Sequence, residues 1–594
     1  MAHQSENAKR LKIRTRCVSS VADLPNMEPG SASAWLFVLP FERTIADAER
    51  SEAWFTALRC FAEKLPDESV VAILTSPQDA AETLSCLVDP MQFQLWVALK
   101  LDTPIVRDSR QLPEHHAALL VFTKYRASLR HTKTRIAYTF CPVCDKTTKD
   151  YGGKKHTYHE YGTLVSDIWR DISYVPGKEP TDVATRLADL FGLDGYGDLM
   201  VLDLTGSGEL KPKPGENEPG VSGTFRSGTG LDSQLINGDS LTKLRELPEN
   251  SVDFCFADPP YNLAKRYDSW DDAIDARQYL KWCNDWLDEL ARVLRPGCTC
   301  AVLNIPILAV RHFIHMKRRL SFQSWIAWEG LSLPVRMIMP AHYAIVCFSK
   351  GIPRPLPGLA QAPRLPSEHG DLLSLRENYC IRQSCVAMRR KMREPDRQPI
   401  TDLWWDIHRL KHNSRRVDHP CQLPPALMRR LIALFTYRDE IVLDPFNGAG
   451  TTTLCSAFME RRYIGIELSE KYHQLAQSRH QFLQEGGDPF EKVKNVPKAK
   501  NSRVQRIGGS KYEVSKKTLQ LEVRRVAVRL GHLPSRDELE QLGQYPIRYY
   551  EEYFLSWGEV CAAARTTGMN EIRKGTVAET RIHQPLLYDT IESQ

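Results

Sequence analysis

The segment "EIVLDPFNGAG", residues 440–450, decides the fold of the second half of this chain. It is an apolar strand that ends at Asp444 and continues into a glycine loop, and residues 451–462 then have helical spacing. Glycines at this place let a ligand approach the backbone at the carboxyl end of a sheet. The next strand, residues 463–467, ends at Glu467, which is placed to bind ribose hydroxyls. Strands that alternate with helices predict a parallel α/β sheet.

A second motif, "FADPPYN" (256–262), ends another apolar strand earlier in the chain. Two consecutive prolines cannot continue a strand or a helix, because neither has an N–H and each fixes φ. They predict a rigid turn with Asp258 before it and Tyr261 after it. The helical pattern that follows carries Trp282 and Trp286, which we expect in the core because they keep the apolar spacing.

The motif "DPPY", followed later by "DPFNGAGTT" and "GIELSEKY", resembles the amino-methyltransferases of DNA, which use S-adenosylmethionine. The order, with the catalytic motif first and the cofactor loop last, is that of their beta class, and the resemblance covers residues 233–483. It implies an α/β, Rossmann-like methyltransferase fold with a doubly wound, mostly parallel sheet, and double-stranded DNA as the partner. The residues that match the catalytic motif are Asp258, Pro259, Pro260 and Tyr261. The residues that match cofactor-binding positions are Asp239, Asp444, Phe446, Gly448, Gly450, Thr451 and Glu467.

The resemblance implies a way to make an exocyclic amine of a base nucleophilic. Asp258 and the carbonyl of Pro259 would accept hydrogen bonds from the amine, and Tyr261 would stack on a base flipped from the duplex. Adenine N6 is favoured over cytosine N4, because cytosine enzymes more often carry Ser at the position of Asp258. Leu423 departs from the family, which usually has a lysine there. A catalytically silent DNA-binding protein, or a methyltransferase for RNA or a protein amide, is the competing interpretation.

The first 209 residues lack both motifs but repeat the order of the second half. "WLFVLPFE" (35–42) resembles "FCFADPPY", with Leu39 at the place of Asp258, and "SDIWRDI" (166–172) resembles "TDLWWDI" (401–407). We therefore expect two tandem copies, the first degenerate; an unrelated α/β domain is the alternative. The expected organisation is a degenerate methyltransferase-like domain at 1–209, a linker at 210–232, and a catalytic domain at 233–490 with target recognition within 305–400.

The C-terminal part is expected to be a small all-α domain at 516–570, between a basic linker at 491–515 and a tail at 571–594. Ser535 and Glu538 have the spacing of a capping box. The segment resembles the helical repeats associated with homing endonucleases, on these residues: Gly531, Pro534, Ser535, Phe554, Ser556, Trp557 and Glu559. Such units bind DNA, and the phosphate contacts would come from Arg524, Arg525, Arg529, Arg548 and the run 492–506. The competing interpretation is a helical cap that only packs on the body.

Four cysteines are candidate ligands of one structural zinc. Cys141 and Cys144 form a C-x-x-C pair, and Cys380 and Cys385 stand at the matching place of the second half. If the halves pack about a pseudo-twofold axis, the two pairs could share one tetrahedral site. A local site with His156 and His159, or four reduced thiols without metal, are the alternatives.

Bulk properties agree with a nucleic-acid enzyme but do not identify one. The net charge is +6 over 594 residues, a weak indication of a polyanionic partner. No apolar run approaches the ~20 residues of a membrane span, and the N-terminus has no apolar stretch of a secretory signal. We therefore predict no membrane partner, and a cytoplasmic, nucleoid-associated prokaryotic protein. The resemblance implies a restriction-modification or phage-defence system, in which a restriction nuclease or another defence protein would be the partner.

Overall fold

The computed structural model describes most of the chain, in two compact units. The first unit contains two large β-sheets, and the second contains the helices near the C-terminus. The described residues are 12–18, 21–30, 32–41, 48–87, 91–124, 134–148, 163–191, 198–205, 231–262, 274–330, 338, 340–359, 370–393, 396–409, 422–491, 516–554 and 557–562. Most of the linker at 210–232, most of the basic linker at 491–515, the tail at 571–594, and His156 with His159 lie outside them.

The second half of the chain forms a sheet of eight strands in its described part, in the order β10-β19-β18-β11-β12-β14-β13-β17. Its strands are β10 (Gln234–Asn237), β11 (Val252–Ala257), β12 (Leu294–Asn304), β13 (Ser321–Glu329), β14 (His342–Ser349), β17 (Leu403–Trp404), β18 (Ile441–Asp444) and β19 (Arg462–Glu467). Among these strands, β14 runs antiparallel to both of its neighbours, and all other pairs are parallel. The sheet is therefore mostly parallel, as predicted.

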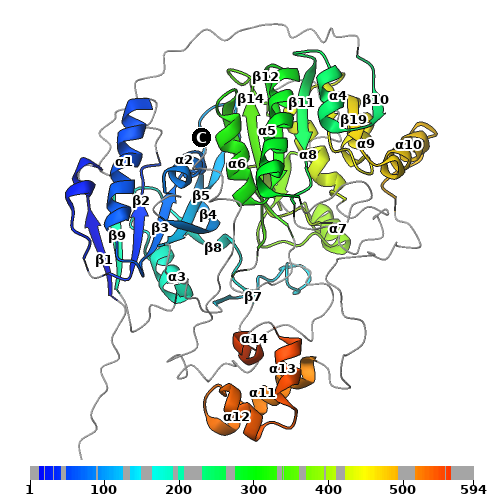
Figure 1. The fold of residues 1–594 in the computed structure, drawn as a ribbon. Coiled ribbons are helices and arrows are strands. Elements are labelled where there is room, and N and C mark those ends of the chain that lie inside the picture. The colour runs from blue at the N-terminus through cyan, green and yellow to red at the C-terminus, as the bar shows by residue number, and fades with distance from the viewer. Residues whose placement is uncertain are drawn as a thin grey trace, which may run out of the picture. The chain divides into compact units, whose positions relative to one another are not determined.

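Side chains alternate between the two faces of this sheet, because successive residues of a strand point in opposite directions. In β11, Cys255 and Ala257 pack in one buried cluster, and Phe254 and Phe256 pack in another. The first cluster includes side chains of α4 (Ser240–Glu246), α5 (Ala276–Val293) and α6 (Pro306–Met316). The second includes those of α8 (Pro425–Phe435) and α9 (Thr451–Phe458), and α10 (Glu470–Gln484) follows β19. Helices on both faces make the fold doubly wound and Rossmann-like, which confirms the predicted fold class (Figure 1).

The first half forms a sheet of seven strands in its described part, in the order β1-β9-β2-β3-β5-β4-β8. The strands are β1 (Lys12–Cys17), β2 (Ala34–Val38), β3 (Val70–Thr75), β4 (Gln92–Ile105), β5 (Glu114–Thr123), β8 (Ile168–Tyr174) and β9 (Asp198–Asp203). The helices are α1 (Ala48–Lys64), α2 (Pro77–Leu87) and α3 (Thr181–Phe191), with a 3-10 turn, η1, at Val21–Asn26. The run β9-β2-β3-β5-β4-β8 has the same order and the same strand directions as β18-β11-β12-β14-β13-β17.

The two sheets contact each other through equivalent strands. Trp96 of β4 and Trp325 of β13 are both buried, and their rings stack with centroids 4.2 Å apart. A small apolar cluster lies beside this pair and takes side chains from both halves: Ala98, Ile168, Ala327, Leu403 and Trp405. The strand pair β4–β8 at the edge of the first sheet thus packs through apolar side chains against the equivalent pair β13–β17 at the edge of the second sheet.

Buried carboxylates cross this contact in both directions. Asp402 accepts a hydrogen bond of 2.6 Å from the backbone N–H of His115. Asp167 accepts one of 2.8 Å from the backbone N–H of His342. Asp167 in "SDIWRDI" and Asp402 in "TDLWWDI" hold the same place in the two halves, so each half caps the strand of the other in the same way.

Shorter elements complete the first unit. They are β6 (Arg135–Ile136) with β7 (Thr163–Leu164), β15 (Leu373–Leu375) with β16 (Arg397–Pro399), and α7 (Gln383–Met392).

Nowhere in the described chain is there a helix with both the length and the apolar character that crossing a membrane would require.

The second unit contains α11 (Lys516–Leu530), α12 (Arg536–Leu542), α13 (Ile547–Tyr553) and α14 (Trp557–Ala562) around a small core of its own. Ser535 caps α12 by accepting from the N–H of Glu538, whose side chain accepts from the N–H of Ser535. This confirms the predicted capping box. The indole of Trp557 donates to the carbonyl of Pro534 at 3.0 Å, so two residues of the predicted repeat motif contact each other.

Candidate active site

The two predicted motifs meet at one edge of the second sheet. β11 and β18 are neighbouring parallel strands, with Phe254 beside Val442, so their carboxyl ends lie at the same edge. Asp258 follows β11 directly, and Asp444 is the last residue of β18. β19 lies on the other side of β18 and brings Glu467 to this edge. This is the place where open α/β sheets bind their ligands.

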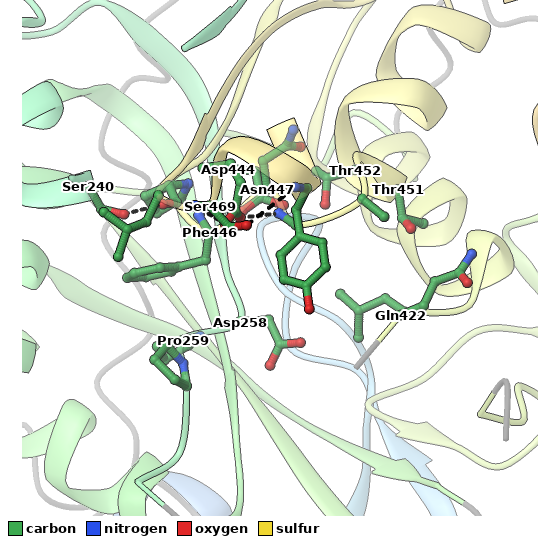
Figure 2. A pocket seen from close by; sticks show the side chains of 18 of the residues that line it. Ser240, Asp258, Pro259, Gln422, Asp444, Phe446, Asn447, Thr451, Thr452 and Ser469 are labelled. Carbon is green, nitrogen blue, oxygen red and sulfur yellow. Dashed lines mark hydrogen bonds between the residues drawn. The ribbon is translucent and has the colours of Figure 1, made fainter. Parts of the chain in front are cut away.

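A pocket opens at this edge and encloses about 1100 Å³ of space, including its open mouth. Every predicted catalytic and cofactor-binding residue except Gly450 lines it. These residues are Asp239, Asp258, Pro259, Pro260, Tyr261, Asp444, Phe446, Gly448, Thr451 and Glu467. The other lining residues are Ser240, Trp282, Arg409, Gln422, Leu423, Pro445, Asn447, Ala449, Thr452, Leu468, Ser469 and Tyr472. Figure 2 shows Asp258 and Pro259 facing Asp444 and Phe446 across this space, with the Asp258 carboxyl pointing into it.

The double-proline turn is held by hydrogen bonds from both sides. The hydroxyl of Tyr261 donates to Asp258 Oδ1 at 2.8 Å, and the hydroxyl of Tyr279 donates to the carbonyl of Pro260 at 2.7 Å. Tyr261 is 7% exposed, and its burial, together with the charge of Asp258, raises the pKa of its phenol well above the usual value. Tyr261 therefore stays protonated and keeps the Asp258 carboxylate in one orientation.

The glycine loop is tied to the end of β19 by the carboxylate of Glu467. Its Oε2 accepts from the N–H of Gly448 at 2.7 Å, and its Oε1 accepts from the N–H of Ser469 at 2.8 Å. Glu467 thus fixes the loop to the end of β19, and its side chain lines the pocket.

Gly450 is the one predicted cofactor-binding residue that is not among the residues lining the pocket. It lies at the N-cap of α9 with φ +81°, a conformation that other residues rarely adopt. A Cβ at this position would lie 3.1 Å from the Cβ of Ala476 in α10. Glycine is therefore required here for the backbone conformation and for the approach of α10.

Acidic groups dominate the pocket. Four carboxyl side chains line it: Asp239, Asp258, Asp444 and Glu467. Asp444 is 3% exposed, and burial raises its pKa to about 7; the charges of Asp258 and Glu467 act in the same direction, against the hydrogen bond from the N–H of Phe446. Four carboxyls around one space, one of them buried with a raised pKa, favour a ligand with positive charge.

Phe446 lies between the pocket and two tryptophans of α5. Its ring centroid is 5.6 Å from that of Trp282 and 5.2 Å from that of Trp286. Trp286 is fully buried, as predicted, but Trp282 is only partly buried and lines the pocket. The expectation that both belong only to the core was wrong for Trp282, because helical spacing does not show where a hollow opens beside a helix.

The cation of the pocket was not predicted. Arg409 is the one basic residue among the described residues that line the pocket. Its guanidinium lies 4.7 Å from the centre of the Tyr343 ring and donates a hydrogen bond to the Tyr343 hydroxyl. Leu423, at the place of the family's lysine, also lines the pocket. No motif marks Arg409, which lies between β17 and α8, whereas Gln422 belongs to the stretch "DHPCQLPP" that resembles the family.

The four predicted zinc ligands lie together, and none of them lines this pocket. The sulfur atoms of Cys141, Cys144, Cys380 and Cys385 all lie within 4.8 Å of one another. His156 and His159, the predicted local alternative, are outside the described residues.

Comparisons with known proteins agree with the family that the motifs resemble. Residues 252–478 match the DNA methylase family of the N6/N4 type, and residues 514–564 match the homing endonuclease associated repeat. The type II methyltransferase M.BamHI of Bacillus amyloliquefaciens is 33% identical over 240 residues, which cover 40% of this chain and 54% of that protein. M.HpaI of Haemophilus parainfluenzae is 28% identical over 277 residues, 45% of this chain and 80% of its own. The DNA adenine methyltransferase YhdJ of Escherichia coli (strain K12) is 26% identical over 247 residues, 41% of this chain and 81% of its own.

Solved structures give weaker likenesses. A DNA modification methylase from Thermus thermophilus, complexed with S-adenosyl-L-methionine, is 21% identical with a TM-score of 0.29, over 43% of this chain and 94% of that one. The chain thus spans about half the length of M.BamHI and about four fifths of the other two relatives. Residues 252–478 are a DNA methylase domain of the amino-methyltransferase family, and residues 514–564 are a homing endonuclease associated repeat.

Proposed function

We propose that this chain transfers a methyl group from S-adenosylmethionine to N6 of adenine in duplex DNA. The observation that carries the proposal is the shared pocket, in which the Asp258 turn after β11 faces the glycine loop after β18. A rigid acceptor group on one strand end and a ligand cradle on the next are what amine methylation requires.

The pocket suits S-adenosylmethionine by its charge and by the groups that line it. Bound there, the cofactor supplies a methyl group on a positively charged sulfonium, and the four carboxyls suit that charge. Glu467 would accept hydrogen bonds from the ribose hydroxyls, and Phe446 would offer an aromatic face to the adenine ring. Arg409 is the group we assign to an anion, either the cofactor's carboxylate or a phosphate of the DNA.

The chain's own residues would prepare the amine. Asp258 and the carbonyl of Pro259 would each accept a hydrogen bond from one N–H of the amine, which draws the nitrogen lone pair away from conjugation with the ring. The hydroxyl of Tyr261 holds Asp258 in place, and its ring would stack on the flipped base. The two prolines keep this geometry fixed, so little reorganisation accompanies the transfer.

Adenine is the proposed acceptor on two grounds. Cytosine-N4 enzymes more often carry Ser where this chain has Asp258, and one relative, YhdJ, is named a DNA adenine methyltransferase. N4-methylcytosine as the product would overturn this part and leave the rest of the proposal standing.

DNA contacts are proposed for both units. In the second unit, Arg524, Arg529 and Arg548 have exposed side chains, whereas Arg525 is engaged with Glu522 at 2.6 and 2.9 Å. In the first unit, α6, β13 and β14 belong to the sheet core, so target recognition within 305–400 falls to the remaining residues of that range. These include the exposed cations Arg390, Lys391 and Arg393, on and directly after α7.

We propose that the first half is a methyltransferase-like domain, from a duplication, without its own catalysis. The equal strand order supports this, as does Asp203, which ends β9 and accepts the N–H of Thr205 as Asp444 accepts that of Phe446. Leu39 follows β2 where Asp258 follows β11, and it is buried in the apolar core. The proposed domain boundaries are 1–209, 233–490 and 516–570.

The proposed setting is a restriction-modification system in a prokaryotic cytoplasm, because several relatives are type II methyltransferases. The test is incubation of the purified chain with labelled S-adenosylmethionine and unmethylated duplex DNA, followed by nucleoside analysis. Label in N6-methyladenine is the expected result. Cofactor binding without transfer to any nucleic acid would favour the silent DNA-binding protein instead, and label in RNA or protein would redirect the substrate.

A further inference from the structure

We propose that the first unit carries one structural zinc ion, bound by Cys141, Cys144, Cys380 and Cys385, that joins the two halves of the chain. The site shares no residue with the methyltransferase pocket and does not depend on the proposed catalysis.

The four sulfur atoms have the spacing of a single tetrahedral ion. They all lie within 4.8 Å of one another, and the Sγ atoms of Cys144 and Cys380 are 3.9 Å apart. Zinc–sulfur bonds of about 2.3 Å place the sulfurs of a tetrahedral site roughly 3.8 Å apart. All four residues are free thiols, and 3.9 Å is far longer than the ~2.05 Å of a disulfide.

The first pair lies on a tight turn suited to metal binding. The N–H of Cys141 donates to the carbonyl of Lys146 at 2.8 Å, and the N–H of Asp145 donates back to the carbonyl of Cys141 at 2.8 Å. Asp145 has φ +48°, and a bridge from Phe140 to Thr147 closes the turn. The turn brings the two sulfurs of the C-x-x-C pair to the same side.

The second pair comes from the other half and is held by a helix. Cys385 lies in the first turn of α7, and Cys380 lies just before this helix. Cys380 and Cys385 are each 1% exposed and Cys141 is fully buried. Few apolar residues surround the four cysteines: among the described residues, Val143 is the one other apolar side chain that packs in this cluster. Four thiols gathered without a large apolar core need another source of stability, and a metal ion provides it.

Two arginines offset the charge that a metal–thiolate site would carry. Zinc with four thiolates has a net charge of about −2. Arg382 Nη1 lies 3.7 Å from the Cys144 sulfur and donates to the carbonyl of Thr147 at 3.0 Å. Arg389 is 1% exposed, donates to the carbonyl of Cys380 at 2.8 Å, and pairs with Asp396. Asp396 already lies beside the guanidinium of Arg389, and thiolates at the metal site would add negative charge next to both arginines.

The first measurement uses the wild-type chain, purified under reducing conditions and analysed for metal by mass spectrometry. About one zinc per chain is expected. Replacement of the ion by Co²⁺ should give the intense near-ultraviolet band of thiolate ligation and the visible bands of a tetrahedral site. Wild-type protein without zinc, which does not take up Co²⁺ in this form and whose native thiols all react freely, would overturn the proposal.

The variants then separate a shared site from a local one. Cys380→Ser and Cys144→Ser should both lose zinc, because each half supplies two ligands. Cys86→Ser is the matched control: this half-buried thiol in α2 donates to the carbonyl of Thr83, which a serine hydroxyl also can do, so zinc should stay. Zinc retained in Cys380→Ser but lost in His156→Ala would refute the shared site in favour of a local one. If the variants do not fold, the Co²⁺ spectrum of the wild type decides, since its intensity reports the number of thiolates.

Discussion

Asp258→Ala should stop methyl transfer while the chain still binds its cofactor. Asp258 points into the pocket from the end of β11, and the glycine loop that we propose holds the cofactor follows β18. Removing one preorganised group at a reacting centre costs about 10²–10³ in rate, or about 2.7–4 kcal/mol. Affinity for the cofactor should change by less than about tenfold, since three other carboxyls remain around it.

The same variant also removes the acceptor of the Tyr261 hydroxyl. Losing this hydrogen bond costs about 0.5–1.5 kcal/mol, so part of the damage would be to stability. Adding Tyr261→Phe to Asp258→Ala deletes that hydroxyl and should recover the lost stability without recovering transfer. Asp258→Asn keeps the shape and one acceptor oxygen, and its rate should fall between wild type and Asp258→Ala.

The assay is single-turnover transfer of a labelled methyl group to duplex DNA, with cofactor affinity from calorimetry and thermal unfolding on the same samples. Asp285→Ala removes a carboxylate of α5 that pairs with Lys281 at the surface, and it should leave all three readings near wild type. Near-wild-type transfer in Asp258→Ala would refute the catalytic role. Loss of cofactor binding in that variant would mean that Asp258 belongs to the cofactor-binding part of the pocket and not to the part that binds the base.

Four further expectations follow from the described residues. Because the pKa of Asp444 is raised to about 7, its carboxylate forms as the pH rises through that value. The affinity for the cationic cofactor should therefore increase between pH 6 and pH 8, by at most about tenfold per pH unit. Asp444→Asn should lose this pH dependence, and S-adenosylhomocysteine, whose sulfur is uncharged, should show less of it. Arg409→Gln should raise the Kd of the cofactor if Arg409 meets its carboxylate, or the KM for DNA alone if it meets a phosphate, and no change in either would exclude both roles. Trp325→Ala should lower the free energy of unfolding by about 3–5 kcal/mol because it removes a buried ring stacked at 4.2 Å, and a decrease under about 1 kcal/mol would contradict tight packing between the sheets. Deleting residues 505–594 should weaken DNA binding and make its salt dependence shallower by about 0.9 for each phosphate that those residues neutralise, whereas unchanged affinity and slope would favour a packing cap.

The second sheet and its ligand edge could be predicted because their signals are local. The local conformation of an apolar strand, a turn with two prolines and a glycine loop can each be predicted from the residues of that segment alone. Parallel strands then place their carboxyl ends at the same edge of the sheet. Asp258, Asp444 and Glu467 therefore lie around one pocket, as their places in the motifs suggested. The capping box at Ser535 was readable for the same reason, since it spans a single helical turn.

The remaining features depend on contacts between distant residues. Gly450 was expected to let a ligand approach the backbone, but a side chain at this position would instead meet Ala476 of α10, a contact that no loop motif specifies. Trp282 keeps the spacing of the core, yet its ring borders a hollow that only the assembled sheet creates. Arg409 reaches the pocket from a segment without a motif. The four cysteines were brought together in prediction only by assuming a pseudo-twofold relation of the halves, and their sulfur atoms do lie together.

Two pairs of residues that join the two halves agree between the proposed copies, whereas the proposed catalytic aspartate has no counterpart in the first half. Trp96 matches Trp325, and Asp167 matches Asp402, and each pair makes the same contact in both directions. At the place of Asp258, in contrast, the first half has a buried leucine. If the halves arose by duplication, the first copy could lose its catalytic residues because the second copy kept them. The surface through which the first copy contacts the second was still needed and was therefore retained. The first half would then serve the reaction through the rigidity it gives the second sheet, and Trp325→Ala tests this directly, because it should slow transfer together with its loss of stability although it lies outside the residues that line the pocket.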